Sequence, residues 1–537
     1  MKKLISIMLA VFLCVGMLAG CGEKSKPAEG GSTPAGDGGG PAEVQDATLV
    51  IAEGSQWWGA DTVLLDGSSF TQGLVADPII SLDADGNMAP CIAEAVSISE
   101  DGLTITLTIP TDLKFHTGET LLPEDVKASL DRFKAVAPFA SNLDCIESIS
   151  VEGQDVILKL REFTSDIAVS LSGSFITVQD KDVLDAHDDD FLLWGAKPYG
   201  LYYLDTYVEG SHVLLKRNEH YKTYNPLVQN KGPGYYSEIT VRFIPEEFTM
   251  ANALNLGDIQ GSFSISTEGI AQLTRDDLEI KNFVSIPNID YLEFNCDAPL
   301  LTDVRVRKAI ALAIDREKLR EVNNDLVIPS FTIITEGTPN KNDEAEVFFR
   351  DNYNTDIEAS KALLAEAGWA DSDGDGYLDK DGTKLELRIV ANDSVIENNT
   401  VQSLQIQLKQ VGIDLKIETY ADYYHYDVIV EGNYDIGLEH FGWQEPVLLL
   451  QYVMCDTTNS DVCGITDEYY EVVGKIQHSV EYDTRTEYVG KAEELLRENW
   501  ITVPLYSSMA TMVFSDACSD ILFTPNGAAF FNDLKAK

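Results

Sequence analysis

The sequence predicts an α/β fold with at least two lobes, and three observations support this prediction. Segments that alternate apolar and polar residues, as half-buried strands do, are interleaved with segments whose apolar residues recur at helical spacing. In one place a strand, a helix and a second strand follow one another as in a βαβ unit with a right-handed crossover. The 537 residues, of which 44% are hydrophobic, suffice for ordered folding but are too many for one hydrophobic core.

The predicted strands are identified by their alternation. Residues 103–109 alternate strictly between apolar and polar. Residues 385–389 and 413–417 alternate in the same way, and the apolar residues of 401–411 between them keep helical spacing. Gly412 is a natural C-terminal stop for that helix. The last three segments form the predicted βαβ unit.

Three other helices are predicted from the residues of their first turns. Pro123 is followed by two acidic residues, a combination favoured at the start of a helix. Thr355 with Glu358, and Thr484 with Glu487, have the spacing of capping boxes. We expect a helix to begin at each of these places.

The first residues predict a secreted lipoprotein. Lys2 and Lys3 precede an almost unbroken apolar run over residues 4–18, as in a secretory signal peptide. Leu18-Ala19-Gly20-Cys21 then resembles a bacterial lipobox, in which Cys21 is lipidated and becomes the mature N-terminus. An uncleaved membrane anchor is the alternative, but the run is shorter than the roughly 20 apolar residues of a spanning helix.

A flexible tether is predicted after this signal, which ends at residue 21. Residues 22–46 are dominated by Gly, Pro, Ser and Ala and cannot bury enough apolar surface to fold. As a flexible chain they would span on the order of 25–30 Å. The acyl chains would hold the body at the extracellular face of the cell membrane, or in the periplasm where the source has an outer membrane.

The charge of the chain excludes one class of partner. Lys and Arg number 39 against 88 Asp and Glu, which gives a formal net charge of -49. Such a surface repels nucleic acid and anionic lipid, and no long basic cluster follows Lys3. We therefore expect no nucleic-acid partner and no basic membrane-binding face.

Neither the cysteines nor the known motifs indicate a zinc site or an enzyme. Outside the signal and the lipobox, the cysteines are scattered without Cys-x-x-Cys spacing. Cys455 and Cys463 are close enough in sequence for a disulfide, but the pairing stays open and buried thiols are the alternative. No Gly-x-Ser-x-Gly, Walker or His-Glu-x-x-His motif occurs. Spacing alone leaves a two-carboxylate glycosidase open.

A series of short motifs runs through the chain in a fixed order. The segments are 89–90, 93–94, 99–104, 113–118, 123–130, 197–200, 215–221, 253–259, 294–295 with Pro299, 303–309, 313–316, 364–369 and 432–435. In this order the series resembles the solute-binding proteins of ABC importers in the peptide/nickel group. The resemblance covers roughly residues 47–537.

The resemblance implies a bilobal type II periplasmic-binding-protein fold without enzymatic activity. Lobe I would comprise residues 47–294, with an extra subdomain at about 86–195, and the chain would return to it at 505–537. Lobe II would comprise residues 295–504. A ligand would bind between the lobes of a monomeric receptor, be buried by hinge closure, and pass to the permease subunits of the importer.

The resemblance also indicates where a ligand would bind. Peptide-binding members have a Gly-Trp pair, then an aspartate that holds the α-ammonium of the peptide, then an acid-Pro pair. Here Gly442-Trp443 and Glu445-Pro446 match the two pairs, but the aspartate is missing. Glu445 would receive the amine instead, or would only be a helix-entry acid. His440, just upstream, is a further polar candidate.

Three more aromatic residues are candidates for the ligand cleft. Trp57 and Trp58 would form its floor, because aromatic rings stack well on sugar faces and on ligand side chains. Tyr506 matches a tyrosine at the cleft edge of the family. The alternative for the tryptophans is the core, and for Tyr506 an ordinary strand position.

An acidic loop has the spacing of a calcium-binding loop. Asp371, Asp373, Asp375 and Asp379 stand at its positions 1, 3, 5 and 9. Gly382 stands where a bidentate Glu belongs. The alternative is a turn that only connects a helix to a strand. We expect no cofactor other than this structural calcium.

These observations lead to one hypothesis with ordered alternatives. The leading hypothesis is a lipid-anchored extracellular receptor that captures a peptide and delivers it to an ABC permease. An oligosaccharide receptor is second, because of Trp57, Trp58, Trp443 and the missing aspartate. A receptor for nickel or another metal chelate is third, since the 7 histidines form no metal-ligand pair in sequence. A secreted acid-rich hydrolase is disfavoured by the resemblance.

Overall fold

The computed structural model describes most of the chain after the predicted tether. The described residues are 47–64, 69–83, 86–173, 175–421, 424–452, 467–515, 521–523 and 529–535. The predicted signal, Cys21 and the tether lie outside them, as do Cys455, Cys463 and Cys518. Of the described cysteines, Cys91 and Cys145 are buried free thiols, and Cys296 is disulfide-bonded. Within these ranges no helix combines the length and the apolar character needed to cross a membrane.

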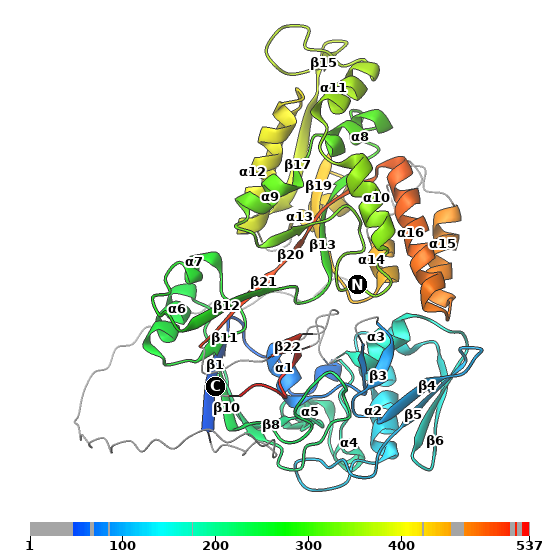
Figure 1. The fold of residues 1–537 in the computed structure, drawn as a ribbon, viewed down its shortest axis with the longest axis vertical. Helices are drawn as coiled ribbons and strands as arrows, with labels where there is room; N and C mark the ends of the chain where they lie inside the picture. The colour runs from blue at the N-terminus through cyan, green and yellow to red at the C-terminus, as the bar shows by residue number, and fades with distance from the viewer. Residues whose placement is uncertain are drawn as a thin grey trace, which may run out of the picture. The chain divides into compact units, whose positions relative to one another are not determined.

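Lobe I is built on a mixed seven-stranded sheet (Figure 1). β1 pairs in parallel with β10 and β11, while β21, near the C-terminus, pairs antiparallel with β11 and β12. Buried Leu49 and Ile51 of β1 and Ile239 and Val241 of β10 belong to its core. In sheet order the strands are β12 (Leu278–Phe283), β21 (Ala510–Ser515), β11 (Gly261–Ser262), β1 (Ala47–Glu53), β10 (Tyr236–Phe243), β9 (His212–Arg217) and β8 (Tyr202–Val208).

A separate antiparallel sheet forms a subdomain of lobe I. Its strands are, in order, β4 (Ala95–Ile98), β5 (Thr104–Thr108), β7 (Asp155–Leu160) and β6 (Ile146–Glu152), and β6 and β7 contact α2 (Pro123–Val136). The alternation of 103–109 therefore predicted β5 correctly, and Pro123 begins α2 as expected. The Asp125 carboxylate accepts the Leu122 N–H at 2.7 Å, which satisfies one donor at the helix start.

The remaining elements of lobe I are short. The helices are α1 (Phe70–Val75), α3 (Asp166–Ser172), α4 (Lys181–Ala186), α5 (Asp189–Gly195), α6 (Glu247–Leu256) and α7 (Thr267–Ile270), with 3-10 turns at Thr62–Leu64 and Ala140–Leu143. The small strand pairs are β2 (Ile80–Leu82) with β3 (Met88–Pro90), and β22 (Leu522–Phe523) with β23 (Ala529–Phe530). α1, the end of α3 and β23 supply walls of the pocket described below.

Lobe II is built on a six-stranded sheet with two hydrophobic cores. β13 connects them, because its side chains alternate: Leu292 and Phe294 belong to one core, and Ile289 and Tyr291 to the other. In order, the strands are β14 (Val327–Pro329), β20 (Thr502–Ser508), β13 (Asn288–Phe294), β19 (Ile436–Gly442), β17 (Glu386–Asn392) and β18 (Asp414–Tyr420). A small hairpin of β15 (Asp379–Lys380) and β16 (Thr383–Lys384) lies apart from this sheet.

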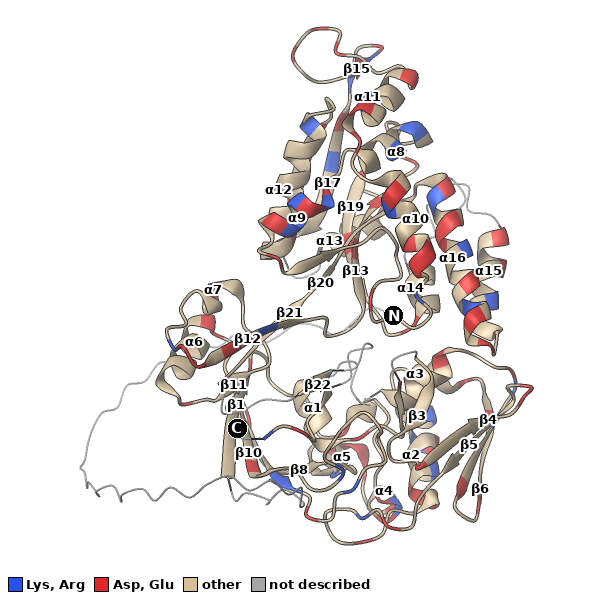
Figure 2. Ribbon diagram, in the orientation of Figure 1, with Lys and Arg blue, Asp and Glu red and all other residues tan. Residues whose placement is uncertain are grey.

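The predicted βαβ unit is present in lobe II. β17 and β18 pair in parallel, and α12 (Val395–Lys409) lies between them in the sequence. The helices of the first core are α8 (Val304–Leu312), α9 (Arg316–Val322), α11 (Ile357–Glu366) and α12; those of the second are α14 (Pro446–Tyr452), α15 (Asp467–His478) and α16 (Tyr482–Asn499). α10 (Asp343–Tyr353) and α13 (Tyr424–Val430) complete the lobe. Asp and Glu are frequent on α10, α15 and α16 (Figure 2).

The structure corrects several predicted boundaries. β13 and β20 lie in the lobe II sheet, so the lobe changes occur at residues 284–287 and at Met509 instead of at 295 and 505. The reason is that the Asn295 motif follows β13 and does not precede it. α11 begins at Ile357 with Asp356 as its cap, and α16 begins at Tyr482, so neither predicted capping box is the actual helix start.

Candidate functional site

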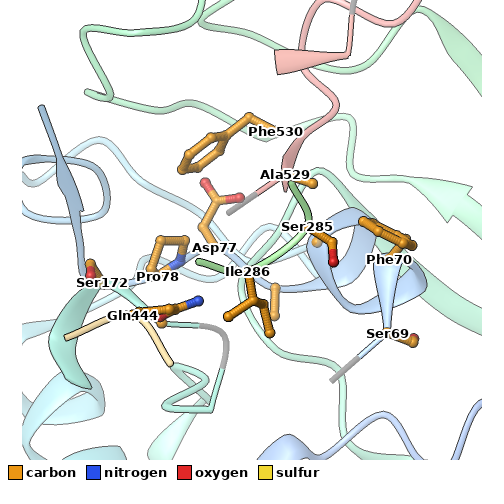
Figure 3. Close-up of a pocket in the computed structure, with 13 residues that line it drawn as sticks. Ser69, Phe70, Asp77, Pro78, Ser172, Ser285, Ile286, Gln444, Ala529 and Phe530 are labelled. Atoms are coloured by element: carbon orange, nitrogen blue, oxygen red, sulfur yellow. The ribbon is translucent and has the colours of Figure 1, made fainter. Parts of the chain in front are cut away.

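A pocket of about 200 Å³ lies between the two lobes. Lobe I supplies α1, the segment that follows it, the end of α3, and β23. The connection between β12 and β13 supplies Ser285 and Ile286, and lobe II supplies Gln444. Figure 3 shows these side chains around one space; the lining residues are Ser69, Phe70, Gly73, Ala76, Asp77, Pro78, Ser172, Gly173, Ser285, Ile286, Gln444, Ala529 and Phe530.

Asp77 is the charged residue among those that line this pocket. Its backbone N–H donates to the Tyr199 carbonyl at 2.9 Å, and its Oδ2 accepts the Tyr221 hydroxyl at 2.6 Å. Its carboxylate points toward the ring of Phe530 (Figure 3). Burial raises the pKa of Asp77 to about 7, although the Tyr221 hydrogen bond acts in the opposite direction. The sequence reasoning missed this residue, since it belongs to no recognisable motif.

A second pocket of about 130 Å³ adjoins the first, because Ile286 and Gln444 line both. Trp443 lines this second pocket, and its ring centroid lies 6.2 Å from that of Phe139 in lobe I. The Trp443 N–H donates to the Pro287 carbonyl at 2.9 Å, which fixes its backbone to the connection between the lobes. Trp443 thus lies where the two lobes meet, and its contact with a ligand stays a prediction.

Glu445 has a structural role at the same interface. Its Oε1 accepts the Val447 N–H at 2.9 Å and its Oε2 the Leu448 N–H at 3.1 Å, so it caps the first turn of α14. Ser165 of lobe I also donates to Oε1, at 3.0 Å. These contacts favour the alternative of a helix-entry acid, while Glu445 also lines the second pocket and its predicted role as an amine receptor stays a prediction.

Glu445 also faces a second acid across the interface. Burial and the neighbouring Asp166 raise the pKa of Glu445 well above its ordinary value. The pKa of Asp166 is also raised, mainly by burial. The Asp166 carboxylate is contacted by the Gln477 side-chain amide at 3.5 Å. Burial of the two acids side by side therefore disfavours the charged form of both.

Gly442 and His440 lie at the end of β19. Gly442 pairs with Asn288 of β13, and a Cβ there would lie 3.3 Å from the Asn288 Cβ. The His440 side chain is 46% exposed, and its Nδ1 lies 3.1 Å from Oδ2 of buried Asp290. Burial lowers the pKa of His440, but the charge and hydrogen bond of Asp290 outweigh it, so the pKa is raised. His440 thus presents an oriented ring, but it is not among the residues that line either pocket.

The other aromatic residues predicted to contact a ligand, Trp57, Trp58 and Tyr506, line neither pocket. Trp57 is buried in the core of lobe I, where its ring meets Trp194 edge to face at 5.9 Å. Tyr506 is fully buried in the first core of lobe II, and its hydroxyl lies 2.7 Å from Thr400 Oγ1. These positions correct both expectations in favour of their structural alternatives. Trp58 is 69% exposed and lines neither pocket.

The acidic loop brings together three of its four predicted calcium ligands. Carboxylate oxygens of Asp371, Asp373 and Asp375 lie within 4.8 Å of one another. Asp379 instead accepts the Ser372 hydroxyl at 2.6 Å and its N–H at 2.9 Å. The Lys384 ammonium pairs with Asp375. The residues therefore fit a calcium ion only in part, because Asp379 is bonded to Ser372 outside the group of three and a cation already neutralises Asp375.

Comparison with known proteins identifies the family of this chain. Residues 87–455 match the family of bacterial extracellular solute-binding proteins, family 5. The chain belongs to this family. Its members bind solutes and are not enzymes, so the hydrolase alternative falls away.

Individual relatives agree with this assignment. The oligopeptide-binding protein AppA of Bacillus subtilis is 24% identical over 416 residues, which cover 72% of this chain and 71% of AppA. The structure of NikA from Brucella suis with Fe(III)-EDTA has a TM-score of 0.75 at 21% identity, over 92% of this chain and 100% of NikA. The structure of B. subtilis AppA with a nonapeptide has a TM-score of 0.64 at 18% identity, over 91% and 99%. The predicted bilobal α/β fold is confirmed.

Proposed function

We propose that this protein captures a peptide between its lobes and delivers it to the permease of an ABC importer. The observation that carries the proposal is the pocket lined by both lobes and by the connection between them. A ligand there touches α1 and β23 of lobe I and Gln444 of lobe II together, so its binding free energy favours the closed arrangement. The sequence similarity to the oligopeptide-binding protein AppA supports a peptide as that ligand.

The attachment to the membrane is a second part of the proposal. Cys21 carries the lipid, and residues 22–46 serve as the tether of the body. Replacing Cys21 by Ala should release the protein from the membrane fraction without changing its ligand affinity. Retention of the Cys21→Ala protein in the membrane would contradict the lipid anchor.

Ligand-induced stabilisation tests the ligand class. Thermal unfolding of the chain from residue 22 is followed with peptide pools, with xylo- and cello-oligosaccharides, and with nickel chelates. A ligand at 100 times its dissociation constant adds roughly 2.7 kcal/mol to the free energy of unfolding, which gives a measurable rise in Tm. We expect the rise with peptides. A rise only with sugars or only with nickel chelates would replace the peptide by that ligand.

Nickel chelates are included because of the likeness to nickel-binding relatives such as the nickel-binding periplasmic protein of Escherichia coli. No group of three or more potential metal ligands in the described part of the chain contains a histidine. A bare nickel ion therefore has no preformed site there, and a chelate would be recognised mainly through its organic part.

Delivery to the permease is tested in cells. A strain without this protein should lose uptake of a labelled peptide that the purified protein binds, and the wild-type chain should restore it. Unchanged uptake in the deletion strain would separate binding from import.

A further inference from the structure

We propose that Asp77 is the receptor for a ligand ammonium group, so that the charge of the ligand is recognised by lobe I. This inference rests on the proposed function and names the chemistry by which its pocket selects ligands. A peptide offers such a group at its N-terminus or on a lysine side chain. Four observations on the pocket support the inference.

The first observation is that the described residues donate hydrogen bonds to only one oxygen of the Asp77 carboxylate. Oδ2 accepts the Tyr221 hydroxyl at 2.6 Å and lies 4.0 Å from the Cys91 thiol. The Tyr221 hydroxyl in turn accepts from the Asn532 amide at 3.0 Å, so Oδ2 is held by an ordered chain of donors. Oδ1 receives no hydrogen bond from any described residue. A ligand donor can therefore take this second oxygen.

The second observation is that Asp77 is buried without a counter-charge. Its side chain is 4% exposed, and no cationic side chain of the described residues contributes to its pKa. A buried carboxylate of this kind is costly in its charged form unless a cation pairs with it. An ammonium group that enters the pocket supplies this missing partner.

The third observation is the character of the other walls. The aromatic rings of Phe70 and Phe530 line the same pocket, and aromatic faces attract cations. Ser69, Ser285 and Gln444 are neutral, and the lining residues that the structure describes include no Lys, Arg or His. The pocket therefore offers an anionic group, aromatic surface and neutral hydrogen-bonding groups, a combination that favours an ammonium over a carboxylate.

The fourth observation concerns the acid on the opposite lobe. Glu445 is 2% exposed, and its two oxygens already accept hydrogen bonds from Ser165, Val447 and Leu448. Both oxygens are therefore already engaged by the protein, although Glu445 also lines the second pocket. Among the described residues that line the first pocket, Asp77 is the acid, and it enters the interlobe space from lobe I (Figure 3).

The test compares peptides with and without an ammonium group on the full-length lipoprotein in detergent. The probes are an arginine-free pool of tripeptides to pentapeptides and the same pool after full acetylation of its amines. We expect the wild-type protein to bind the untreated pool roughly tenfold to a hundredfold more tightly, because hydrogen bonds to charged groups have this strength. Asp77→Asn should reduce this ratio to near one and leave the affinity for acetylated peptides unchanged.

Two further variants make the result specific. Glu493→Gln is a matched control, since Glu493 is a buried acid whose pKa burial also raises to about 7, but it lies in lobe II away from the pocket-lining residues. It should keep the wild-type ratio. Asp77→Ser removes the charge with a smaller side chain and replaces Asp77→Asn if circular dichroism shows that the latter is unfolded.

A lysine-free pool shows which ammonium group of the peptide Asp77 binds. If wild type still binds the untreated lysine-free pool more tightly than the acetylated one, the group is the α-ammonium. If this preference is lost, the group is the lysine side chain.

The contradicting outcomes are distinct. If wild type prefers untreated peptides and Asp77→Asn keeps that preference, the peptide receptor stands and Asp77 is not the ammonium receptor. If wild type binds both pools equally, the protein recognises no ammonium group. The peptide receptor then stands as well, and the inference about Asp77 is wrong. If wild type binds neither pool, the peptide function itself fails, and the inference that rests on it fails as well.

Discussion

Asp77 and Glu445 are both buried acids at the interface of the lobes, but the protein satisfies them differently. Glu445 accepts two backbone N–H groups of α14 and the Ser165 hydroxyl of the opposite lobe. Asp77 lines the first pocket, accepts the Tyr221 hydroxyl on Oδ2, and receives no hydrogen bond on Oδ1 from the described residues. The comparison distinguishes an acid whose two oxygens are both bonded within the fold from an acid with one oxygen that the described residues leave unbonded, and the second kind suits the proposed contact with a ligand.

The largest effect is expected from the pH dependence of stability at Asp77. Its pKa is raised from 3.8 to about 7 in the folded protein, so the folded state keeps a proton that the unfolded state has already lost. The Asp77 contribution to the free energy of unfolding is therefore fully present below pH 4 and decreases by about 1.4 kcal/mol per pH unit until the folded pKa is passed.

Asp77→Asn should remove this decrease in the ligand-free protein. Urea unfolding at intervals between pH 4 and pH 8 measures it, with wild type and variant compared at each pH. Other buried acids, such as Glu493, contribute equally to both proteins and cancel in the difference. If the difference in unfolding free energy between wild type and Asp77→Asn stayed constant across this pH range, Asp77 would have a counter-charge in the folded protein.

A smaller loss of stability is expected from Glu445→Ala. The substitution removes the cap of α14 and leaves the Ser165 hydroxyl without its acceptor, at a combined cost of about 2 kcal/mol. Glu445→Gln should cost less, because the amide has a similar size and keeps an acceptor oxygen for the N–H and hydroxyl donors. Urea unfolding at pH 7 measures both. Equal losses for the two variants would contradict the capping role.

A substitution at Trp443 tests whether a ligand binds at the interface of the lobes. Trp443→Ala should weaken binding of a peptide by tenfold or more, because the ring lines the second pocket between the lobes. The body should stay folded, since Trp443 is only partly buried against its core. Calorimetric titration with a peptide from the thermal screen measures the affinity, and circular dichroism checks the fold. Unchanged affinity would place the ligand outside these pockets.

Tyr506→Phe is the matched control for that experiment. Tyr506 lies in the core of lobe II and its hydroxyl contacts only Thr400 among the described residues. Its loss should leave peptide affinity unchanged and lower stability slightly. A loss of affinity equal to that of Trp443→Ala would instead favour the predicted role of Tyr506 at the cleft edge.

The smallest effect is expected at the acidic loop. EDTA should leave Tm unchanged, because Lys384 neutralises Asp375 and Asp379 is bound to Ser372. A fall of Tm on chelation that added calcium reverses would restore the predicted calcium site. The loop lies apart from the residues that line both pockets, so peptide affinity should not change in either case.

The sequence predicted those parts of the fold that depend on local periodicity. The alternation around Ile105 and Leu107 located β5, and the strand–helix–strand pattern located β17, α12 and β18. Helix starts were less certain, because Asp356 instead of Thr355 caps α11 through the Ala359 N–H. Two adjacent residues with capping side chains compete for that position, and only the backbone conformation decides between them.

The site was predicted only in part for a physical reason. Trp443 was found because a motif surrounds it, and the structure places it between the lobes. Asp77, the proposed ammonium receptor, was not among the predicted residues because its pocket joins segments near residues 77, 173, 286, 444 and 530. No periodicity or spacing connects positions so distant in the chain. Trp57 and Tyr506 are buried in hydrophobic cores and do not line the pockets. The sequence could not show this, because an aromatic residue in a core has the same sequence signature as one in a cleft.

The structure of the protein with a bound peptide tests the central claim most directly. Crystals are grown with a peptide that the thermal screen identifies. We predict an ammonium nitrogen of the peptide within hydrogen-bonding distance of Asp77 Oδ1, about 3 Å, while Glu445 keeps its contacts with α14 and Ser165. A peptide whose ammonium groups lie against Glu445 or in solvent, with Asp77 Oδ1 unoccupied, would contradict this account.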